Sequence, residues 1–463
     1  MRVAAVDQGT TSTRCLVVDE QQVLMVAAKK HARFHPHAGW VEQDAEELLR
    51  NIQHVLGQTG PVDAIAIANQ GESCLAWDAE TGCPLSPVIV WQDARTEAQL
   101  KSLGAAQALR SQAITGLPLD PYFSASKLGW LVKNIPAVEA ARKCQRLRLG
   151  TTDAFFLDRL SGQFLTDAAT ASRTGLMDLS TLQWSTEMCQ LHGVPLESLP
   201  SIVAVNHGFG NINGVPVIAS IVDQQAALYG HGCTAPGQGK ITFGTGAFFL
   251  ATTGGQRPEP RTLLPTVAWQ MRDAPPVYAI EGGVYDAGAA VEWARGLGLF
   301  SSPEELAALD GPSALSRGIA FVPALSGLAA PHWDRTAAPM FIGMDLASGP
   351  MDLAKAVLVG IAMLTAELLG EAAASTPLSA SISIDGGLSQ NRYFARFLAS
   401  ACERRIAVPA MYELSALGLA GLCGVPIHAL RGKVETFEPE GLVSASERTR
   451  FSQALSIAKC WHK

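Results

Sequence analysis

The chain has 463 residues, of which 48% are apolar and 17% are charged, and its formal net charge is -7. One hydrophobic core rarely supports that length, so we expect two domains of about 200 residues each, with a cleft between them. The mildly acidic, ordinary globular composition predicts neither nucleic-acid binding nor attraction to an anionic membrane.

The cysteines and the N-terminal residues favour a cytoplasmic protein. The nine cysteines are odd in number and include no Cys-x-x-Cys pair, which argues against a disulfide framework or a zinc site. Asp7 stands where a signal peptide would continue its apolar core, and the best apolar stretch, residues 356–366, is too short to cross a bilayer. We therefore expect a protein that is neither secreted nor inserted in a membrane.

The chain opens with the pattern of a β-hairpin. Residues 3–6 and 15–18 are apolar, and the loop between them, residues 7–13, is rich in Gly, Thr and Ser. A similar pattern recurs where two apolar runs, residues 241–243 and 247–251, flank a Gly-Thr-Gly turn. The recurrence predicts two related halves, an N-terminal domain over residues 1–230 and a C-terminal domain over residues 231–463.

Helix and strand signals are mixed along the rest of the chain. Apolar periodicity and cap residues predict helices over residues 44–56, 128–132 and 351–374, and short apolar runs predict strands over residues 64–68 and 382–384. This mixture predicts an α/β fold.

The first hairpin loop has the composition of a phosphate site. Residues 7–14 combine a carboxylate, a glycine, four hydroxyl side chains and the cation of Arg14. Glycine lets backbone N–H groups approach an anion, hydroxyls and Arg14 add donors, and Asp7 has the oxygen ligands that Mg²⁺ prefers. The alternative is a hairpin turn that only happens to be polar. The second loop, Gly244 to Gly246, favours the phosphate interpretation, because two loops can hold a phosphate chain from two domains.

Aromatic residues in polar surroundings predict a polyol pocket. Trp91, Tyr122 and Phe248 have faces that pack against C–H surfaces, and the carboxylates of Glu72 and Asp223 accept hydrogen bonds from hydroxyls. Taken singly, each aromatic favours the alternative of a place in the core.

Asp223 is the best candidate for a catalytic base. It directly follows the small and apolar residues 219–222, and open α/β sheets build their ligand sites at the carboxyl ends of strands. The alternative is an aspartate that caps a helix over residues 224–228.

The nucleotide requires a cradle other than a P-loop, because no Gly-x-x-x-x-Gly-Lys-Ser/Thr sequence occurs. Residues 382–384 lead into Asp385, Gly386 and Gly387 and then into a helical stretch over residues 390–400. Such a turn lets a flat or anionic ligand approach the backbone, although similar corners are common in α/β proteins without nucleotides.

Taken together, these segments resemble the FGGY carbohydrate kinases, and most closely the branch that phosphorylates glycerol. The resemblance covers nearly the whole chain in order. Residues 122–134 look like the first family signature, and the second signature, near Gly343, is partly kept. The other matching segments are residues 7–14, 39–44, 69–78, 90–96, 115–130, 150–153, 166–174, 223–230, 243–248, 281–288, 321–334, 385–391 and 416–421.

The resemblance implies two ribonuclease H-like, actin-type domains that close over ATP and a sugar or polyol. It assigns Asp223 as the general base and Asp7 as the magnesium-associated carboxylate. By position it implies phosphate contacts at Thr10, Thr11, Arg14 and Thr245, nucleotide contacts at Gly288, Glu292, Gly387 and Asn391, and a polyol pocket of Glu72, Trp91, Tyr122, Asp223, Gln224 and Phe248. The glycerol-phosphorylating branch usually has Gln at the position of Glu292. Family members commonly form homodimers or homotetramers.

One departure bears on the substrate. Glycerol-specific members carry an arginine immediately before the pocket glutamate, where this chain has Gly71. We therefore expect a pocket without its cationic fork. Hydrogen bonds to a charged donor contribute about 1.5–3 kcal/mol, so without compensation glycerol affinity falls by about one to two orders of magnitude. The glycine also predicts space for a longer substrate.

Three activities follow as hypotheses. The first is phosphorylation of glycerol to glycerol 3-phosphate, and the second is phosphorylation of another polyol or ketose, such as a tetritol, a pentitol or a xylulose-like sugar. The third is a nucleotide-dependent sensor without phosphotransfer, which the retained Asp223 and Asp7 argue against. Residues 208–214 lack the basic, glycine-rich regulatory sequence of the family, which argues against control by a sugar bisphosphate.

Overall fold

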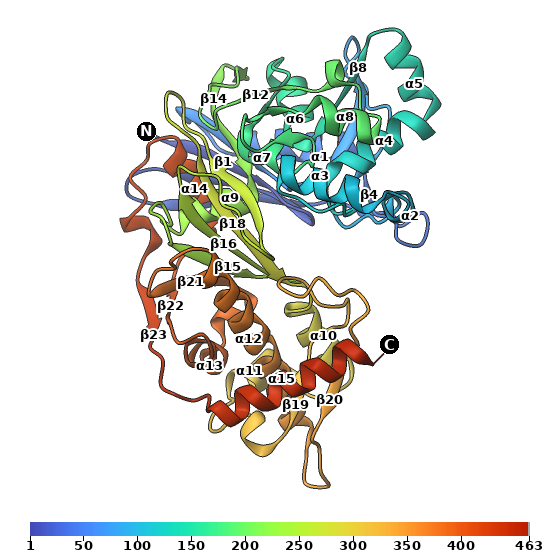
Figure 1. Cartoon of the computed structure of the whole chain (residues 1–463). Coiled ribbons are helices and arrows are strands. Elements are labelled where there is room, and N and C mark those ends of the chain that lie inside the picture. Colours follow the sequence, from blue (N-terminus) through green and yellow to red (C-terminus); the bar gives the residue numbers. More distant parts are fainter. Residues whose placement is uncertain (462–463) are drawn as a thin grey trace.

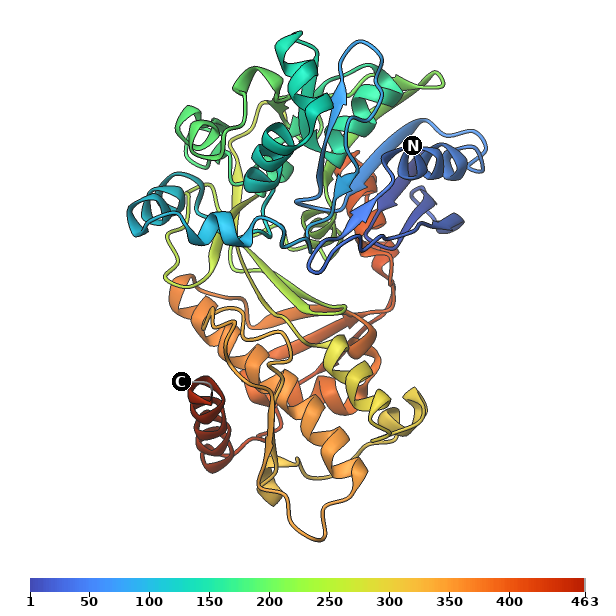
Figure 2. The same ribbon diagram turned by 90° about the vertical axis from the view of Figure 1, so that its right-hand side faces the viewer.

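Two mixed β-sheets organise the molecule, as a computed structural model that describes residues 1–461 shows. In Figures 1 and 2 the first sheet and its helices form the upper part of the molecule, and most of the second half of the chain forms the lower part. The α/β expectation is confirmed.

The first sheet has six strands in the order β13-β14-β5-β1-β2-β3. Its central strands are apolar and buried on both faces, as expected for a sheet that is covered by helices. The strands are β1 (Val3–Gln8), β2 (Ser12–Val18), β3 (Val23–Lys30), β5 (Ala64–Asn69), β13 (Asn211–Ile212) and β14 (Val215–Val222).

The second sheet has seven strands in the order β17-β18-β16-β15-β21-β22-β23. They are β15 (Gly239–Phe243), β16 (Ala247–Gly254), β17 (Leu264–Trp269), β18 (Val277–Val284), β21 (Ser381–Gly386), β22 (Arg405–Pro409) and β23 (Val434–Phe437).

The two sheets repeat one topology. In the first, β1 pairs antiparallel with β2 and parallel with β5. In the second, β15 pairs antiparallel with β16 and parallel with β21. The two predicted hairpins are therefore equivalent strands of two related halves, which confirms the predicted recurrence.

Smaller sheets extend both halves. The first half adds a four-stranded sheet of β4 (Glu42–Gln43), β6 (Cys74–Asp78), β7 (Val88–Ile89) and β8 (Leu147–Thr151), together with the pairs β9 (Leu165–Asp167) with β12 (Ser201–Val203) and β10 (Met177–Asp178) with β11 (Gln183–Trp184). The second half adds the pair β19 (Ala320–Val322) and β20 (Met340–Ile342).

Nine α-helices and one 3-10 turn fill the first half among the described residues. They are α1 (Ala45–Leu56), α2 (Glu97–Lys101), α3 (Ala105–Thr115), α4 (Ser124–Asn134), α5 (Pro136–Lys143), α6 (Thr152–Ser161), α7 (Ala168–Ser172), α8 (Thr186–His192), η1 (Leu196–Ser198) and α9 (Asp223–Gly230).

The second half contains α10 (Gly288–Gly296), α11 (Pro303–Ala307), η2 (Leu315–Arg317), α12 (Pro350–Ser375), η3 (Gly387–Gln390), α13 (Arg392–Cys402), α14 (Leu414–Leu422), η4 (Ala429–Arg431) and α15 (Ala445–Cys460). Within residues 1–461, α12 is the one helix long and apolar enough to cross a membrane, and 72% of its most apolar window is buried inside the protein. Its apolar surface belongs to the core of the second half.

The halves are joined where α9 crosses α14 at van der Waals distance between backbones. A Cβ on Gly230 of α9 would lie 1.9 Å from the Leu414 carbonyl oxygen, and a Cβ on Gly418 of α14 would lie 1.8 Å from the Ala226 carbonyl oxygen. Both glycines are therefore required by the close approach. A helix from the second half of the sequence is in this way packed onto the first sheet, beside the helix that carries Asp223.

The predicted helices and strands are present, with one difference in the first hairpin. The loop is shorter than the sequence predicts, because β1 continues through Asp7 to Gln8 and β2 begins at Ser12. Asp7 is thus a strand residue paired with Arg14, and its position is fixed by the sheet rather than by a loop.

Candidate active site

A cavity of about 150 Å³ lies between the two halves and brings the six predicted polyol residues together. Most of its lining comes from the first half of the chain, and Phe248 of β16 and Glu281 of β18 close it from the second sheet. The lining consists of Thr10, Gln70, Gly71, Glu72, Trp91, Tyr122, Arg173, Val222, Asp223, Gln224, Gln225, Phe248 and Glu281. We call this cavity the polyol pocket.

Asp223 is fixed at the floor of the pocket by two elements. β14 ends at Val222 and α9 begins at Asp223, so the side chain stands at a strand's carboxyl end, and its Oδ1 accepts the backbone N–H of Gln224 at 2.7 Å. Burial raises the pKa of Asp223 to about 7, and the charges of Asp7 and Glu72 add to the rise. A carboxylate that exchanges a proton near neutral pH is suited to general base work.

The aromatic wall of the pocket is held in place by a buried lysine. The Trp91 ring lies 5.4 Å from Tyr122 and 6.4 Å from Phe248, and Trp91 Nε1 donates to Thr10 Oγ1 at 3.0 Å. Lys127 of α4 donates from Nζ to the carbonyls of Tyr122, Val90 and Trp91 at 3.0–3.2 Å. The segment over residues 122–134 therefore positions the two aromatics, a role that sequence reasoning did not assign to Lys127.

Gln224 is oriented by a second buried lysine. Lys240 of β15 donates from Nζ to Gln224 Oε1 at 2.5 Å and to Thr242 Oγ1 at 2.8 Å. The oxygen end of the Gln224 amide is thereby occupied, so its nitrogen end is the one that can donate to a ligand.

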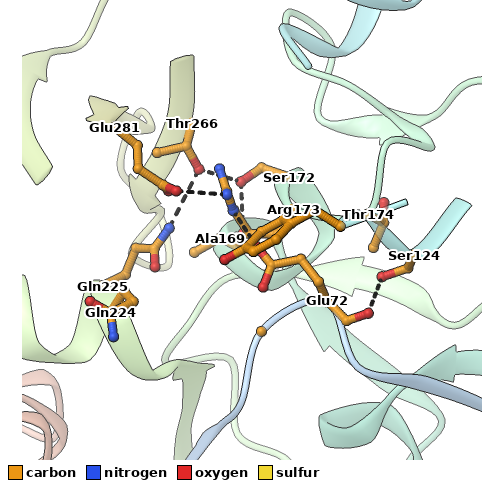
Figure 3. A network of polar contacts seen from close by, with 12 residues as sticks. Glu72, Ser124, Ala169, Ser172, Arg173, Thr174, Gln224, Gln225, Thr266 and Glu281 are labelled. Atoms are coloured by element: carbon orange, nitrogen blue, oxygen red, sulfur yellow. Dashed lines mark hydrogen bonds and ion pairs between the residues drawn. The ribbon is translucent and has the colours of Figure 1, made fainter. Parts of the chain in front are cut away.

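The prediction that the pocket lacks a cation is wrong, because Arg173 supplies one. Arg173 follows α7 and is buried, its Nε donates to Glu72 Oε1 at 2.8 Å, and its Nη2 donates to Glu281 Oε1 at 2.9 Å. Figure 3 shows the guanidinium between these two carboxylates, which come from opposite halves of the chain. Burial opposes the charge on Arg173, but Glu281 and Glu72 outweigh it and raise the pKa of Arg173, so the cation persists.

Glu72 itself is held in an unusual backbone conformation. Its φ is 58°, in the left-handed region, and its carbonyl accepts from Ser124 Oγ at 2.9 Å. Burial raises the pKa of Glu72 to about 7, although Arg173 acts in the opposite direction.

Val222 limits the expected space at Gly71. A Cβ placed on Gly71 would lie 2.9 Å from Val222 Cγ2, so a valine methyl group already occupies the volume next to the glycine. The space directly beside the position of a Cβ at residue 71 is therefore partly filled, while Gly71 still lines the pocket.

The first predicted phosphate loop lies beside the pocket. Thr10 lines the pocket, whereas Thr11 is exposed at the tip of the turn between β1 and β2. Arg14 of β2 pairs with Asp7 at 3.3 Å and with Glu413, the residue before α14, at 2.8 Å. Arg14 thus connects the loop to the second half of the chain, a contact that the sequence did not predict.

Asp7 is the buried acid nearest to this loop. Burial raises the pKa of Asp7 to about 6, while Arg14 lowers it and Glu413 raises it further. No cluster of three or more His, Cys, Asp or Glu side chains suited to a metal ion occurs among residues 1–461. A magnesium ion at Asp7 would therefore take its remaining ligands from phosphate oxygens and water, which suits the ion's preference for keeping several waters.

The second predicted phosphate loop is braced by the start of α10. The N–H of Gly288 donates to the Gly244 carbonyl at 3.0 Å, and the N–H groups of Ala287 and Ala289 donate to the Thr245 carbonyl at 3.0 Å. A Cβ on Gly288 would lie 2.4 Å from the Gly244 oxygen, so only glycine fits there. Thr245 is exposed at the tip of the loop.

The four residues predicted to contact the nucleotide differ in what they offer. Gly288 braces the loop, Gly387 is exposed beside the corner at Gly386, and Glu292 is an exposed residue of α10 paired with Arg295. Asn391 caps α13, with its Oδ1 accepting from the Phe394 N–H at 2.9 Å and its Nδ2 donating to the Leu306 carbonyl at 2.9 Å. Its side chain is thus engaged in fixing the helix.

The fold and the pocket together define a class of protein. Two related α/β halves meet over a buried carboxylate, a polar pocket and two polar hairpin turns, which is the arrangement of an enzyme that transfers a phosphoryl group to an alcohol.

The chain belongs to the FGGY family of carbohydrate kinases. Residues 2–230 match the N-terminal domain of that family and residues 239–426 match its C-terminal domain. The family resemblance inferred from the sequence is therefore confirmed.

Several relatives and solved structures are similar over nearly their full length. Glycerol kinase of Trichlorobacter lovleyi is 40% identical over 92% of this chain and 90% of the relative, and glycerol kinase of Mycoplasma genitalium is 35% identical over 100% and 96%. The structure of Plasmodium falciparum glycerol kinase with ADP superposes with a TM-score of 0.91 at 27% identity, covering 99% of this chain and 98% of the other. A Brucella ovis structure described as a xyloylose kinase has a TM-score of 0.87 at 23% identity over 100% and 99%, which shows the shared fold.

Proposed function

We propose that this enzyme transfers the γ-phosphoryl group of ATP to a primary hydroxyl of glycerol and forms glycerol 3-phosphate. The observation that carries the proposal is the full-length similarity, at 35–40% identity, to relatives named glycerol kinase. The pocket supports it, because the cation expected to be missing at Gly71 is present as Arg173.

In the proposed step, a hydroxyl oxygen of glycerol attacks the γ-phosphorus in line with the departing oxygen of ADP. The new O–P bond forms as the bond to the bridging oxygen breaks, and the hydroxyl proton passes to the Asp223 carboxylate. Glu72 and Gln224 hold the other hydroxyls, and Trp91 and Phe248 cover the carbon chain. Most of the rate gain comes from positioning, because phosphoryl transfer requires little covalent chemistry from the protein.

Phosphate binding is assigned to the two hairpin turns. The donors on the first are Thr10, Thr11 and Arg14, and Thr245 belongs to the second, while Gly288 and Gly387 let the nucleotide approach the backbone. Asp7 would hold Mg²⁺ directly or through water, which is consistent with a buried carboxylate whose one hydrogen-bond partner within residues 1–461 is Arg14. Bound Mg²⁺ supplies charge neutralisation on the phosphate oxygens.

We further propose a cytoplasmic homodimer or homotetramer. All nine cysteines are free, which fits a reducing compartment. Light scattering of the purified protein tests the assembly state, and a mass of one chain at micromolar concentration would contradict it.

The decisive test is an acceptor panel. The purified enzyme is assayed with MgATP and glycerol, erythritol, xylitol, xylulose or no acceptor, with ADP release measured by a coupled assay and the product by ³¹P NMR. We expect kcat/KM for glycerol at least about tenfold above each other acceptor. A higher value for xylulose or a longer polyol refutes the substrate, and ATP turnover that no acceptor increases refutes phosphotransfer.

A further inference from the structure

Arg173 has one set of donors that the protein does not use. The edge of its guanidinium formed by Nε and Nη2 faces Glu72 and Glu281, and Nη1 is buried without a hydrogen-bond partner among residues 1–461. A buried N–H group without an acceptor is unfavourable in a folded protein. Because Arg173 lines the polyol pocket beside Asp223, a ligand in that pocket can supply the missing acceptor.

The surrounding structure holds this guanidinium rigidly. Asp167 caps the start of α7 by accepting the N–H groups of Ala169 and Thr170 at 2.8 and 3.0 Å. At the other end, Ser172 Oγ and Thr266 Oγ1 of β17 are 2.9 Å apart. Arg173 therefore follows a short helix that is anchored in both halves of the chain, as Figure 3 shows for the Ser172 end.

Val222 lies against Gly71 in the lining of the pocket. Its Cγ2 is 2.9 Å from the position that a Cβ at residue 71 would take, so an arginine at 71 and the valine at 222 exclude one another without a shift. The pocket therefore has a cation in Arg173 and a methyl group beside residue 71.

We propose that Arg173 binds substrate directly, with Nη1 donating to a hydroxyl of the acceptor, and that Val222 next to Gly71 restricts the pocket to a short polyol. Arg173 takes the role expected of an arginine at position 71, from the far end of α7. The inference rests on the proposed function, because it names the residues that select that function's substrate.

The test compares variants of Arg173 with a matched buried arginine. Arg95 is the control, because it is equally buried, pairs with the two carboxylates Asp93 and Glu42, and does not line the pocket. In R173Q we expect KM for glycerol to rise about 10- to 100-fold with KM for ATP within about threefold of the parent. In R95Q we expect a lower melting temperature with KM for glycerol unchanged.

Relocating the cation separates binding from folding. G71R alone is expected to lose activity through the contact with Val222, and G71R/V222G to tolerate the new side chain. In R173Q/G71R/V222G we expect a KM for glycerol at least about tenfold lower than in R173Q. A purely structural role of Arg173 cannot explain such a recovery. If R173Q does not fold, R173K retains the charge but not the planar donor fork, and we expect its KM for glycerol to exceed that of the parent by more than about threefold.

The outcomes distinguish this inference from the proposed function. A folded R173Q or R173K with glycerol KM within threefold of the parent overturns the role of Arg173, whatever the parent's preferred acceptor. A parent that phosphorylates none of the panel alcohols overturns the proposed function, and with it the substrate role of Arg173. An enlarged acceptor range in V222A or V222G supports the role of Val222, and an unchanged range overturns it.

Discussion

Replacing Asp223 with asparagine should slow catalysis and stabilise the fold. The amide keeps the shape of the side chain and its acceptor for the Gln224 N–H, but it cannot take a proton. A positioned general base contributes about 10²–10⁴-fold, so kcat should fall by that factor while binding of ATP and glycerol remains measurable. The same substitution also removes a carboxylate charge whose burial lowers the free energy of unfolding.

The stability gain depends on pH with a definite sign. The pKa of Asp223 is raised from 3.8 to about 7 by burial and by Asp7 and Glu72, so the folded state binds this proton more tightly than the unfolded state. The stabilising effect of that proton is complete at low pH and is lost as the pH rises towards 7. Three pKa units correspond to about 4 kcal/mol at pH 8. Burying an amide also has a penalty, so we expect a net gain of about 1–2 kcal/mol in Asp223→Asn.

Thermal unfolding at pH 5 and pH 8 measures this difference. The melting temperature of the variant should exceed that of the parent by a few degrees at pH 8 and by less at pH 5. Asp19→Asn is a control, because Asp19 is partly exposed and a hydrogen bond from the Gln21 backbone lowers its pKa, and it should neither slow turnover nor stabilise. Near-normal turnover in Asp223→Asn would remove Asp223 from the role of base, and a loss of stability at pH 8 would refute the electrostatic account.

Two further predictions concern pH and the contact between the halves. The kcat/KM for the acceptor should decrease as the pH falls below an apparent pKa of about 7, which belongs to the coupled carboxyls Asp223, Asp7 and Glu72. Glu72→Gln should shift this acidic limb of the pH–rate profile to lower pH, because the Glu72 charge raises the pKa of Asp223. An unshifted limb would contradict the coupling. Glu413→Gln should lower KM for ATP about two- to fivefold, because Glu413 then no longer competes with phosphate for the partly exposed Arg14; a raised KM for ATP would show instead that Glu413 orients Arg14 for binding.

The sequence predicted local structure well where turn chemistry and apolar runs coincide. Gly244 to Gly246 lie between β15 and β16 as predicted. Asp223 follows an apolar strand as predicted, but it is the first residue of α9 and not its N-cap, which is Val222. Such features depend on neighbours in the chain, and for that reason they can be read from a short segment. The six residues predicted for the polyol pocket were chosen because each matches a family position. The structure places all six around one cavity, and their roles in binding stay a prediction.

Contacts between distant residues were not predictable in the same way. Arg173 is 101 residues from Glu72 and 108 from Glu281, so an inspection of position 71 alone suggested a pocket without a cation. The pairing of Arg14 with Glu413 joins residues 399 positions apart. A single sequence contains no signal for such pairs unless the register of both sheets is already known. Arg173 did, however, lie within residues 166–174, one of the segments that carried the family resemblance.

The junction of α9 and α14 connects the proposed base to the first predicted phosphate loop. α9 begins with Asp223, and the glycines at Gly230 and Gly418 hold it against α14 with no side chain between the backbones. α14 is preceded by Glu413, which binds Arg14 beside Asp7. A shift of α14 is therefore expected to act on the proposed base Asp223 through the helix contact and on Arg14 through the ion pair. A side chain at either glycine has to separate the helices, so Gly418→Ala should impair turnover and ATP binding together even though it lies outside the polyol pocket.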